Sequence, residues 1–233
     1  MKSLALFVSV HASLAAASHP RLIFGPDVSH YQDVVNWTDV KRAGASFAFA
    51  KASEGVHTGD EQFAKNWEGM RAAGIEVRGA YHFGHPELDP EVQAKHFLSQ
   101  IPTPIQSGDL LVLDIEANSK GMPASSVAKW CMAWLSAVLT ATGLPSTRVL
   151  VYTGAWFWDP QCGGSAAAAR NGHKLWVSGY VDESRLRIPS GWSTWTFWQY
   201  TDRASDCGPV ADVDCSVFNG SMAELRSLAG VGP

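Results

Sequence analysis

Short apolar runs of strand length recur along this 233-residue chain, and its earlier runs are separated by segments with helical periodicity. Several of these runs are clear and two are weaker. The clear runs are residues 47–50, 77–81, 110–113, 148–152, 175–177 and 194–198, and the weaker ones lie near 23–28 and 211–214. Strands that alternate with helices predict a mostly parallel sheet.

The helical segments are 60–73, 123–141 and a shorter one from Asn36 to Gly44. Gly74 supplies a stop signal after the first segment, and Asn36 is a suitable N-cap for the shortest. In the longest segment, Trp130 and Trp134 stand at helical spacing, so we expect both to be core residues.

About eight strands over roughly 210 residues favour a closed barrel over an open sheet. The late strands leave less room for helices between them, so we expect an irregular, TIM-like β/α barrel in a single domain. The first strand is not followed by a glycine-rich phosphate loop, which argues against a dinucleotide-binding fold.

Composition excludes several classes of protein. Hydrophobic residues make up 46% of the chain and charged residues 17%, which excludes a disordered chain. The net charge is −4 and no run of Lys or Arg occurs, so we do not expect a nucleic-acid partner.

The first residues are typical of a secretory signal. Lys2 precedes an apolar stretch that ends in the small residues Ala15, Ala16 and Ala17. This stretch is too short and too interrupted to span a bilayer, and no other window qualifies. We expect a signal peptide over 1–19, a catalytic domain over 20–233, and a secreted, extracellular protein that does not associate with membranes.

The four cysteines fit export. They are Cys131, Cys162, Cys207 and Cys215, and none has the CxxC spacing of a zinc site. In an oxidising compartment they suit two disulfides, for which three pairings are possible. We favour Cys207–Cys215 together with Cys131–Cys162. His82 and His85 also lack the spacing of metal ligands, so we expect no metal site and no cofactor.

Polar and aromatic residues gather where the predicted strands end, which in α/β barrels is the side of the active site. They are Asp27, Lys51, Glu54, Tyr81, His82, Asp114, Glu116, Tyr152, Trp176, Trp198, Gln199 and Asp214. The most informative stretch is LLVLDIE at 110–116, because a buried apolar strand here ends in two acids.

Asp114 and Glu116 are two residues apart and therefore share a strand face. Two carboxylates about 5 Å apart repel by roughly 3 kcal/mol at an effective dielectric near 20. This is about two pKa units, so one acid should stay protonated while the other ionises. Glycoside hydrolysis needs such a pair. The alternative is a solvated acidic strand end.

Eight segments, in order, resemble glycoside hydrolase family 25, the N-acetylmuramidases known as CH-type lysozymes. They are DVSHYQ (27–32), NWTDVKRAG (36–44), FAFAKASEG (47–55), GAYHF (79–83), LVLDIE (111–116), LWVS (175–178), FWQY (197–200) and VDCSVFNG (213–220). The resemblance covers about residues 23–220. It implies an irregular barrel of about five α/β units followed by a β-rich end, and a monomer that cuts bacterial peptidoglycan after N-acetylmuramic acid.

The resemblance also implies roles for single residues. Glu116 matches the general acid and Asp114 the carboxylate beside it, while Asp27 and Asp214 match two further acids of the pocket. Among the aromatics, the residues that match sugar-holding positions are Tyr81 and Trp198, and those that match other pocket positions are Tyr152 and Trp176. One departure is Ser53, where the family more often has threonine.

Two alternatives remain open. A chitinase-like hydrolase resembles a longer DxxDxDxE pattern, which Val112 breaks here. A sugar-binding barrel without catalysis usually lacks the acid, whereas Glu116 is present. The reaction itself could use the substrate's N-acetyl group or a direct attack by water, and both routes use the same residues.

Overall fold

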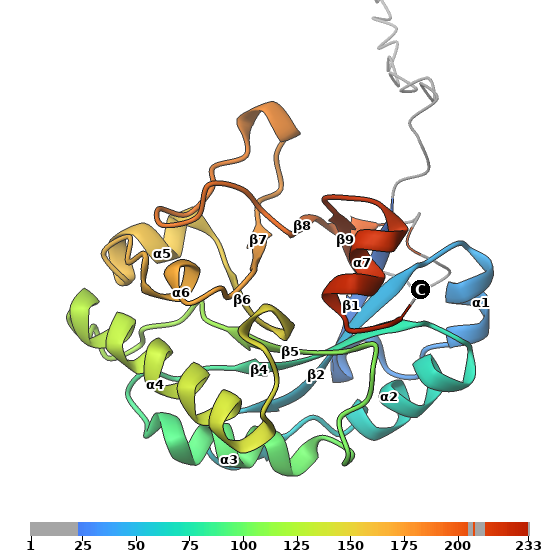
Figure 1. Cartoon of the computed structure of the whole chain (residues 1–233), viewed down its shortest axis with the longest axis horizontal. Coiled ribbons are helices and arrows are strands. Elements are labelled where there is room, and N and C mark those ends of the chain that lie inside the picture. Colours follow the sequence, from blue (N-terminus) through green and yellow to red (C-terminus); the bar gives the residue numbers. More distant parts are fainter. Residues whose placement is uncertain (1–22, 205–206, 208–212, 233) are drawn as a thin grey trace, which may run out of the picture.

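The computed structural model describes residues 23–204, 207 and 213–232, so the expected signal peptide lies outside the described residues. Eight strands form one closed barrel, in the order β1-β9-β8-β7-β6-β5-β4-β2, and β1 pairs with β2 to complete it (Figure 1). The strands are β1 Phe24–Val28, β2 Phe47–Glu54, β4 Val77–Phe83, β5 Asp109–Asp114, β6 Val149–Thr153, β7 Leu175–Ser178, β8 Phe197–Ala204 and β9 Val213–Phe218. A short β3, Thr58–Gly59, forms a hairpin with the end of β2.

Apart from the short β3, which pairs antiparallel with β2, all neighbouring strands from β1 to β8 are parallel, and β9 runs antiparallel to both β8 and β1. The predicted closed barrel in a single α/β domain is therefore confirmed. Because β1 bonds to the last strand, the two extremities of the described chain meet in the barrel wall.

Helices follow the early strands, as the sequence predicts. They are α1 Trp37–Arg42, α2 Phe63–Ala72, α3 Pro90–Gln100, α4 Ala124–Thr142, α5 Ala155–Gln161, α6 Ala167–Arg170 and α7 Met222–Leu228. Figure 1 shows α2, α3 and α4 outside the parallel strands. In the described residues only a 3-10 turn, Glu183–Arg185, separates β7 from β8, so five α/β units precede a β-rich end.

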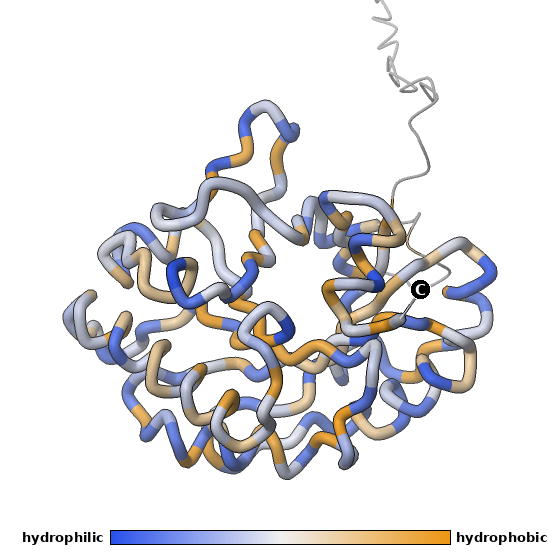
Figure 2. Tube along the Cα trace, viewed as in Figure 1, coloured by the Kyte–Doolittle hydropathy of each residue, from blue (hydrophilic) through white to orange (hydrophobic). Residues whose placement is uncertain are grey.

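The strand side chains point alternately into the barrel and out toward the helices, so they form an inner and an outer apolar layer. Phe47 and Phe49 of β2 point into the barrel, where they pack with Trp176 and Phe197, whereas Ala48 and Ala50 face the outer helices. Trp130 and Trp134 lie buried in the outer layer, as predicted. Figure 2 shows apolar residues along the central strands and polar residues over much of the outer helices and loops.

Helix α7 closes the barrel end at which the parallel strands begin. Leu225 and Ala229 pack on the inner apolar layer, and the Gly108 N–H, just before β5, donates to the Ala229 carbonyl at 2.9 Å. The opposite end, where the parallel strands finish, is therefore the one left for a site. Within the described ranges, no helix combines the length and apolar character needed to cross a membrane.

The cysteines are only half as predicted. Cys207 and Cys215 form a disulfide, but Cys131 and Cys162 are free thiols, so the predicted second disulfide is wrong. Both thiols are buried in the outer apolar layer, and the hydrogen bond that the Cys131 thiol makes with Cys162 raises the pKa of Cys131, as does burial. There they behave as small packed apolar side chains.

Candidate active site

A hollow opens where the parallel strands end. Its lining residues are Asp27, Tyr81, Asp114, Glu116, Tyr152, Trp176, Gln199 and Asp214. The sequence places every lining residue at a predicted strand end, and it suggests a role for each of them except Gln199. The four acids therefore converge in one hollow, although they come from distant parts of the chain.

Strand register explains how the acids meet. Asp27 and Asp214 stand directly opposite each other in the antiparallel β1–β9 pair. Asp114 ends β5, and Glu116 follows after Ile115, whose side chain is buried in the outer layer. The alternation about Ile115 therefore turns both Asp114 and Glu116 inward.

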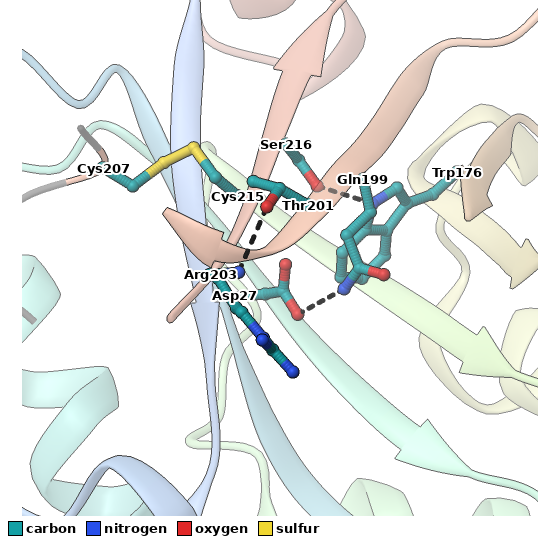
Figure 3. The surroundings of a disulfide bond; sticks show 8 residues. All are labelled: Asp27, Trp176, Gln199, Thr201, Arg203, Cys207, Cys215 and Ser216. Carbon is teal, nitrogen blue, oxygen red and sulfur yellow. Dashed lines mark hydrogen bonds between the residues drawn. A yellow bond between two sulfur atoms is a disulfide. The ribbon is translucent and has the colours of Figure 1, made fainter. Parts of the chain in front are cut away.

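The Gln199 side chain joins two of the acids. Its Nε2 donates to Asp27 Oδ1 at 2.9 Å and to Asp214 Oδ2 at 3.1 Å. Figure 3 shows the contact with Asp27 beside the Cys207–Cys215 disulfide. The hydroxyls of Tyr152 and Tyr180 donate to Gln199 Oε1 at 2.7 and 3.0 Å. The carboxyl groups of Asp27 and Asp214 are thus held in place before any substrate binds.

Burial raises the pKa of all four acids, because little water remains to stabilise their charged forms. Neighbouring carboxylates add to this: Asp214 raises the pKa of Asp27, and Glu116 raises that of Asp114. The pKa of Asp214 rises to about 6. All four groups therefore hold a proton more readily than a solvated carboxyl does, which is what an acid catalyst needs.

The pKa of Glu116 is raised by burial first and by the charge of Asp214 second, while Lys51 lowers it. Lys51 is itself held by Glu54, whose Oε2 lies 2.7 Å from its Nζ. Glu116 therefore has an environment that favours its protonated form, which is the form that can give a proton to a leaving group.

Aromatic rings form the floor and wall of the hollow. The Trp176 ring stacks on Phe49 with centroids 4.1 Å apart, and its Nε1 donates to Ser216 Oγ at 2.9 Å (Figure 3). Tyr152 packs edge-on against Trp176. Trp176 is thus a fixed wall, held by the barrel interior.

Trp198 is not among the residues that line the hollow, and its contact with the sugar stays a prediction. Its ring packs with Leu175, Val177 and Val217 on the other face of β8, and its Nε1 donates to the Gly179 carbonyl at 2.8 Å. Neighbouring residues of a strand point to opposite faces. Because Gln199 points inward, Trp198 must point outward.

His82 lies within β4 and His85 just after it, and both have structural partners. His82 is buried between Ser53 Oγ and Gln93 Oε1, at 2.9 and 3.1 Å from its ring nitrogens, and burial lowers its pKa to about 4. The serine that replaces the more usual threonine thus keeps its hydroxyl in use. In the part of the chain that the structure describes, no group of three or more His, Cys, Asp or Glu is placed to hold a metal ion.

Known proteins share this sequence and fold. The model of the family described as glycosyl hydrolases family 25 matches residues 26–208. Lysozyme M1 of Streptomyces globisporus is 39% identical over 210 residues, which cover 88% of this chain and 70% of that protein. The N,O-diacetylmuramidase of a Chalaropsis species is 30% identical over 215 residues, covering 88% of this chain and 98% of that protein.

Solved structures agree with the sequence relatives. The bacterial lysozyme from Streptomyces coelicolor superposes with a TM-score of 0.82 at 35% identity, covering 91% of this chain and 98% of that one. A family GH25 lysozyme from Aspergillus fumigatus gives a TM-score of 0.80 at 30% identity, covering 90% and 99%. On sequence, barrel and solved relatives together, this chain belongs to glycosyl hydrolases family 25 and is a glycoside hydrolase.

Proposed function

We propose that this enzyme is a secreted lysozyme, an endo-β-1,4-N-acetylmuramidase that cuts bacterial peptidoglycan between N-acetylmuramic acid and N-acetylglucosamine. The observation that carries the proposal is the convergence of Glu116 with Asp114, Asp27 and Asp214 in one hollow at the strand ends. The relatives named lysozyme and muramidase support the substrate class.

In the proposed reaction, Glu116 is the general acid. Burial and the Asp214 charge favour its protonated form, and the proton passes to the glycosidic oxygen as the sugar bond breaks. The electron pair of that bond leaves with the oxygen, so positive charge develops on the sugar ring.

Asp114 is the partner carboxylate in this proposal. Its side chain lines the hollow, and its Oδ1 is buried and accepts no hydrogen bond from the described residues. A carboxylate here stabilises the charged ring, or holds the substrate's N-acetyl group while its carbonyl attacks the anomeric carbon. Attack by water, which inverts the anomeric centre, uses the same two residues.

The test compares the enzyme with its Glu116→Gln variant on bacterial walls and on chitin. The amide of the variant has no acidic proton to give, so we expect the fold to persist and turnover to fall by roughly a hundredfold or more. Wild-type digestion of walls should create reducing ends that carry muramic acid.

Glu91→Gln, an exposed change on α3, serves as the matched control and should keep full activity. Near wild-type clearing of walls by Glu116→Gln would contradict the assigned acid. New glucosamine ends from chitin would support the chitinase alternative, and no new ends from either polymer would support a sugar-binding barrel.

A further inference from the structure

We infer that Gln199 is a positioning residue for the hydrolysis: its amide holds the carboxyl groups of Asp27 and Asp214 in place, and with them the negative charge that faces Glu116. This inference rests on the proposed function of the hollow. Gln199 is not expected to touch the bond that breaks, so it would act through the acids that it holds.

All the hydrogen-bonding capacity of the Gln199 amide is used by side-chain partners. A glutamine side chain has two N–H donors and two acceptor lone pairs. Both donors go to carboxylate oxygens, of Asp27 and Asp214, and both lone pairs receive a tyrosine hydroxyl, from Tyr152 and Tyr180. Gln199 is 2% exposed, so water does not compete for these contacts.

The tyrosines fix which way the amide points. With the amide turned over, Oε1 would face two carboxylates, which are acceptors when ionised, and Nε2 would face two hydroxyls that donate in the observed arrangement. Tyr152 and Tyr180 therefore keep the N–H groups directed at the acids. Tyr180 lies after β7 and is 50% exposed, so a surface side chain takes part in orienting a buried one.

Strand geometry places the two acids where such a bridge can act. Asp27 and Asp214 are directly opposite each other in the β1–β9 pair, and two ionised carboxyls in that position would destabilise the sheet. Gln199 lies on β8, just before an irregularity between Gln199 and Thr201 in the β8–β9 register. Its amide reaches both acids and offsets their repulsion with one donor each.

The bridge has a consequence for the acid catalyst. An N–H donor stabilises an ionised carboxylate, so the loss of Gln199 would make Asp214 harder to ionise. Less charge on Asp214 would remove a contribution that keeps Glu116 protonated. Among the described residues, the other charged or titratable groups around the hollow are Asp27 on β1, Lys51 and Glu54 on β2, Tyr81 on β4, Asp114 at the end of β5, Tyr152 on β6, Tyr180 after β7 and Asp202 on β8.

The experiment measures kcat and KM against pH on soluble peptidoglycan fragments for wild type, Gln199→Leu and Gln199→Glu. For Gln199→Leu we expect kcat to fall roughly tenfold to a hundredfold with a smaller change in KM, because positioning acts on the chemical step. The alkaline limb of the kcat profile should move to lower pH by about half a unit to one unit.

Gln199→Glu tests the same point with an isosteric side chain. Its carboxyl still accepts from the tyrosines, but it offers one proton at most, and only when protonated. It should therefore recover part of the lost kcat as the pH is lowered. Gln106→Leu, an exposed change beyond the opposite end of the barrel, is the matched control and should leave the profile unchanged.

A readout independent of turnover is carboxyl ¹³C NMR titration, which should show a lower pKa for Glu116 in Gln199→Leu. Should that variant fold poorly, Tyr180→Phe removes one donor at a half-exposed position and should shift the limb in the same direction by less. Unchanged profiles and carboxyl titrations in folded variants would overturn the inference. If Glu116→Gln stays active, the proposed function fails first; if only the Gln199 variants behave like wild type, the inference fails alone.

Discussion

Asp214 shows at the scale of a single residue how the site costs stability. Burial raises the pKa of this carboxyl from 3.8 to about 6, so the folded protein binds the proton more tightly than the unfolded chain does. The resulting stability is fully present below about pH 4 and is lost as the pH rises through 6. At neutral pH, the ionised Asp214 therefore lowers the free energy of unfolding.

Asp214→Asn should raise the free energy of unfolding at pH 7. A shift of two units corresponds to roughly 3 kcal/mol, and partial exposure of the side chain reduces this to about 1 kcal/mol. Urea unfolding at pH 7 and at pH 4 checks the sign, since the gain should vanish at pH 4. Asp182→Asn, on the exposed loop after β7, should show no such pH-dependent gain. Equal stability of Asp214→Asn and wild type at both pH values would contradict the argument.

Single residues also show how far the sequence predicts the site. Asp27 and Asp114 follow apolar runs near the ends of parallel strands, so the sequence places both at the open end of the barrel. Asp214 is instead the second residue of β9, and it reaches the same end because β9 runs antiparallel to β1 and β8. Trp198 and Gln199 are adjacent on β8, so only one of the two side chains can point into the barrel, and the sequence does not say which. The strand run before them begins at Phe197 in the structure and not at residue 194, and only the closed barrel settles this register.

At the scale of elements, β4 has a glycine, Gly79, where the Phe49 ring of the neighbouring strand β2 fills the barrel interior. A Cβ placed on Gly79 would lie 1.9 Å from Cδ1 of Phe49. The Phe49 ring cannot move aside easily, because it stacks on Trp176 and contacts Phe197 edge-on. The φ of Gly79 lies outside the left-handed region, so its backbone conformation does not require glycine. The reason for glycine here is the space that the Phe49 ring occupies.

Gly79→Ala should therefore lower the free energy of unfolding by about 1 to 3 kcal/mol, as overpacked cores do. Gly232→Ala is the matched control, because nothing lies within 4 Å of a Cβ there. Denaturant unfolding of both variants gives the comparison. A Gly79→Ala protein as stable as Gly232→Ala would mean that the inner layer can rearrange around an added methyl group.

Helix α3, Pro90–Gln100, is one of the elements that the sequence analysis did not predict, and its buried face shows why. Its buried face consists of Gln93, Ala94 and Phe97, so a polar residue interrupts the apolar period on which the prediction rests. Gln93 is buried because its amide binds His82 and the backbone of His85, a need that arises only in the folded barrel. The start signals, Asp89 as N-cap and Pro90 in the first turn, are nevertheless visible in the sequence.

At the scale of the whole molecule, the barrel has two ends with separate tasks. The parallel strands finish at the hollow, and β1 and β9 bring Asp27 and Asp214 there only when the barrel closes. The Cys207–Cys215 disulfide links Cys215, which follows Asp214 near the start of β9, to Cys207 (Figure 3). At the other end, α7 covers the inner apolar layer, so this end contributes stability without touching the acids.

Leu225→Ala tests this division. Leu225 is fully buried in α7 and packs on the same inner layer as Phe47 and Phe197, so truncation leaves a cavity where the parallel strands begin. The free energy of unfolding should fall by about 2 to 5 kcal/mol. The kcat of the folded fraction should equal that of wild type, because the hollow and its carboxyl groups lie at the opposite end. Turnover and circular dichroism measured on one sample at several temperatures separate the two quantities, and a loss of kcat in fully folded protein would show that the two ends are coupled.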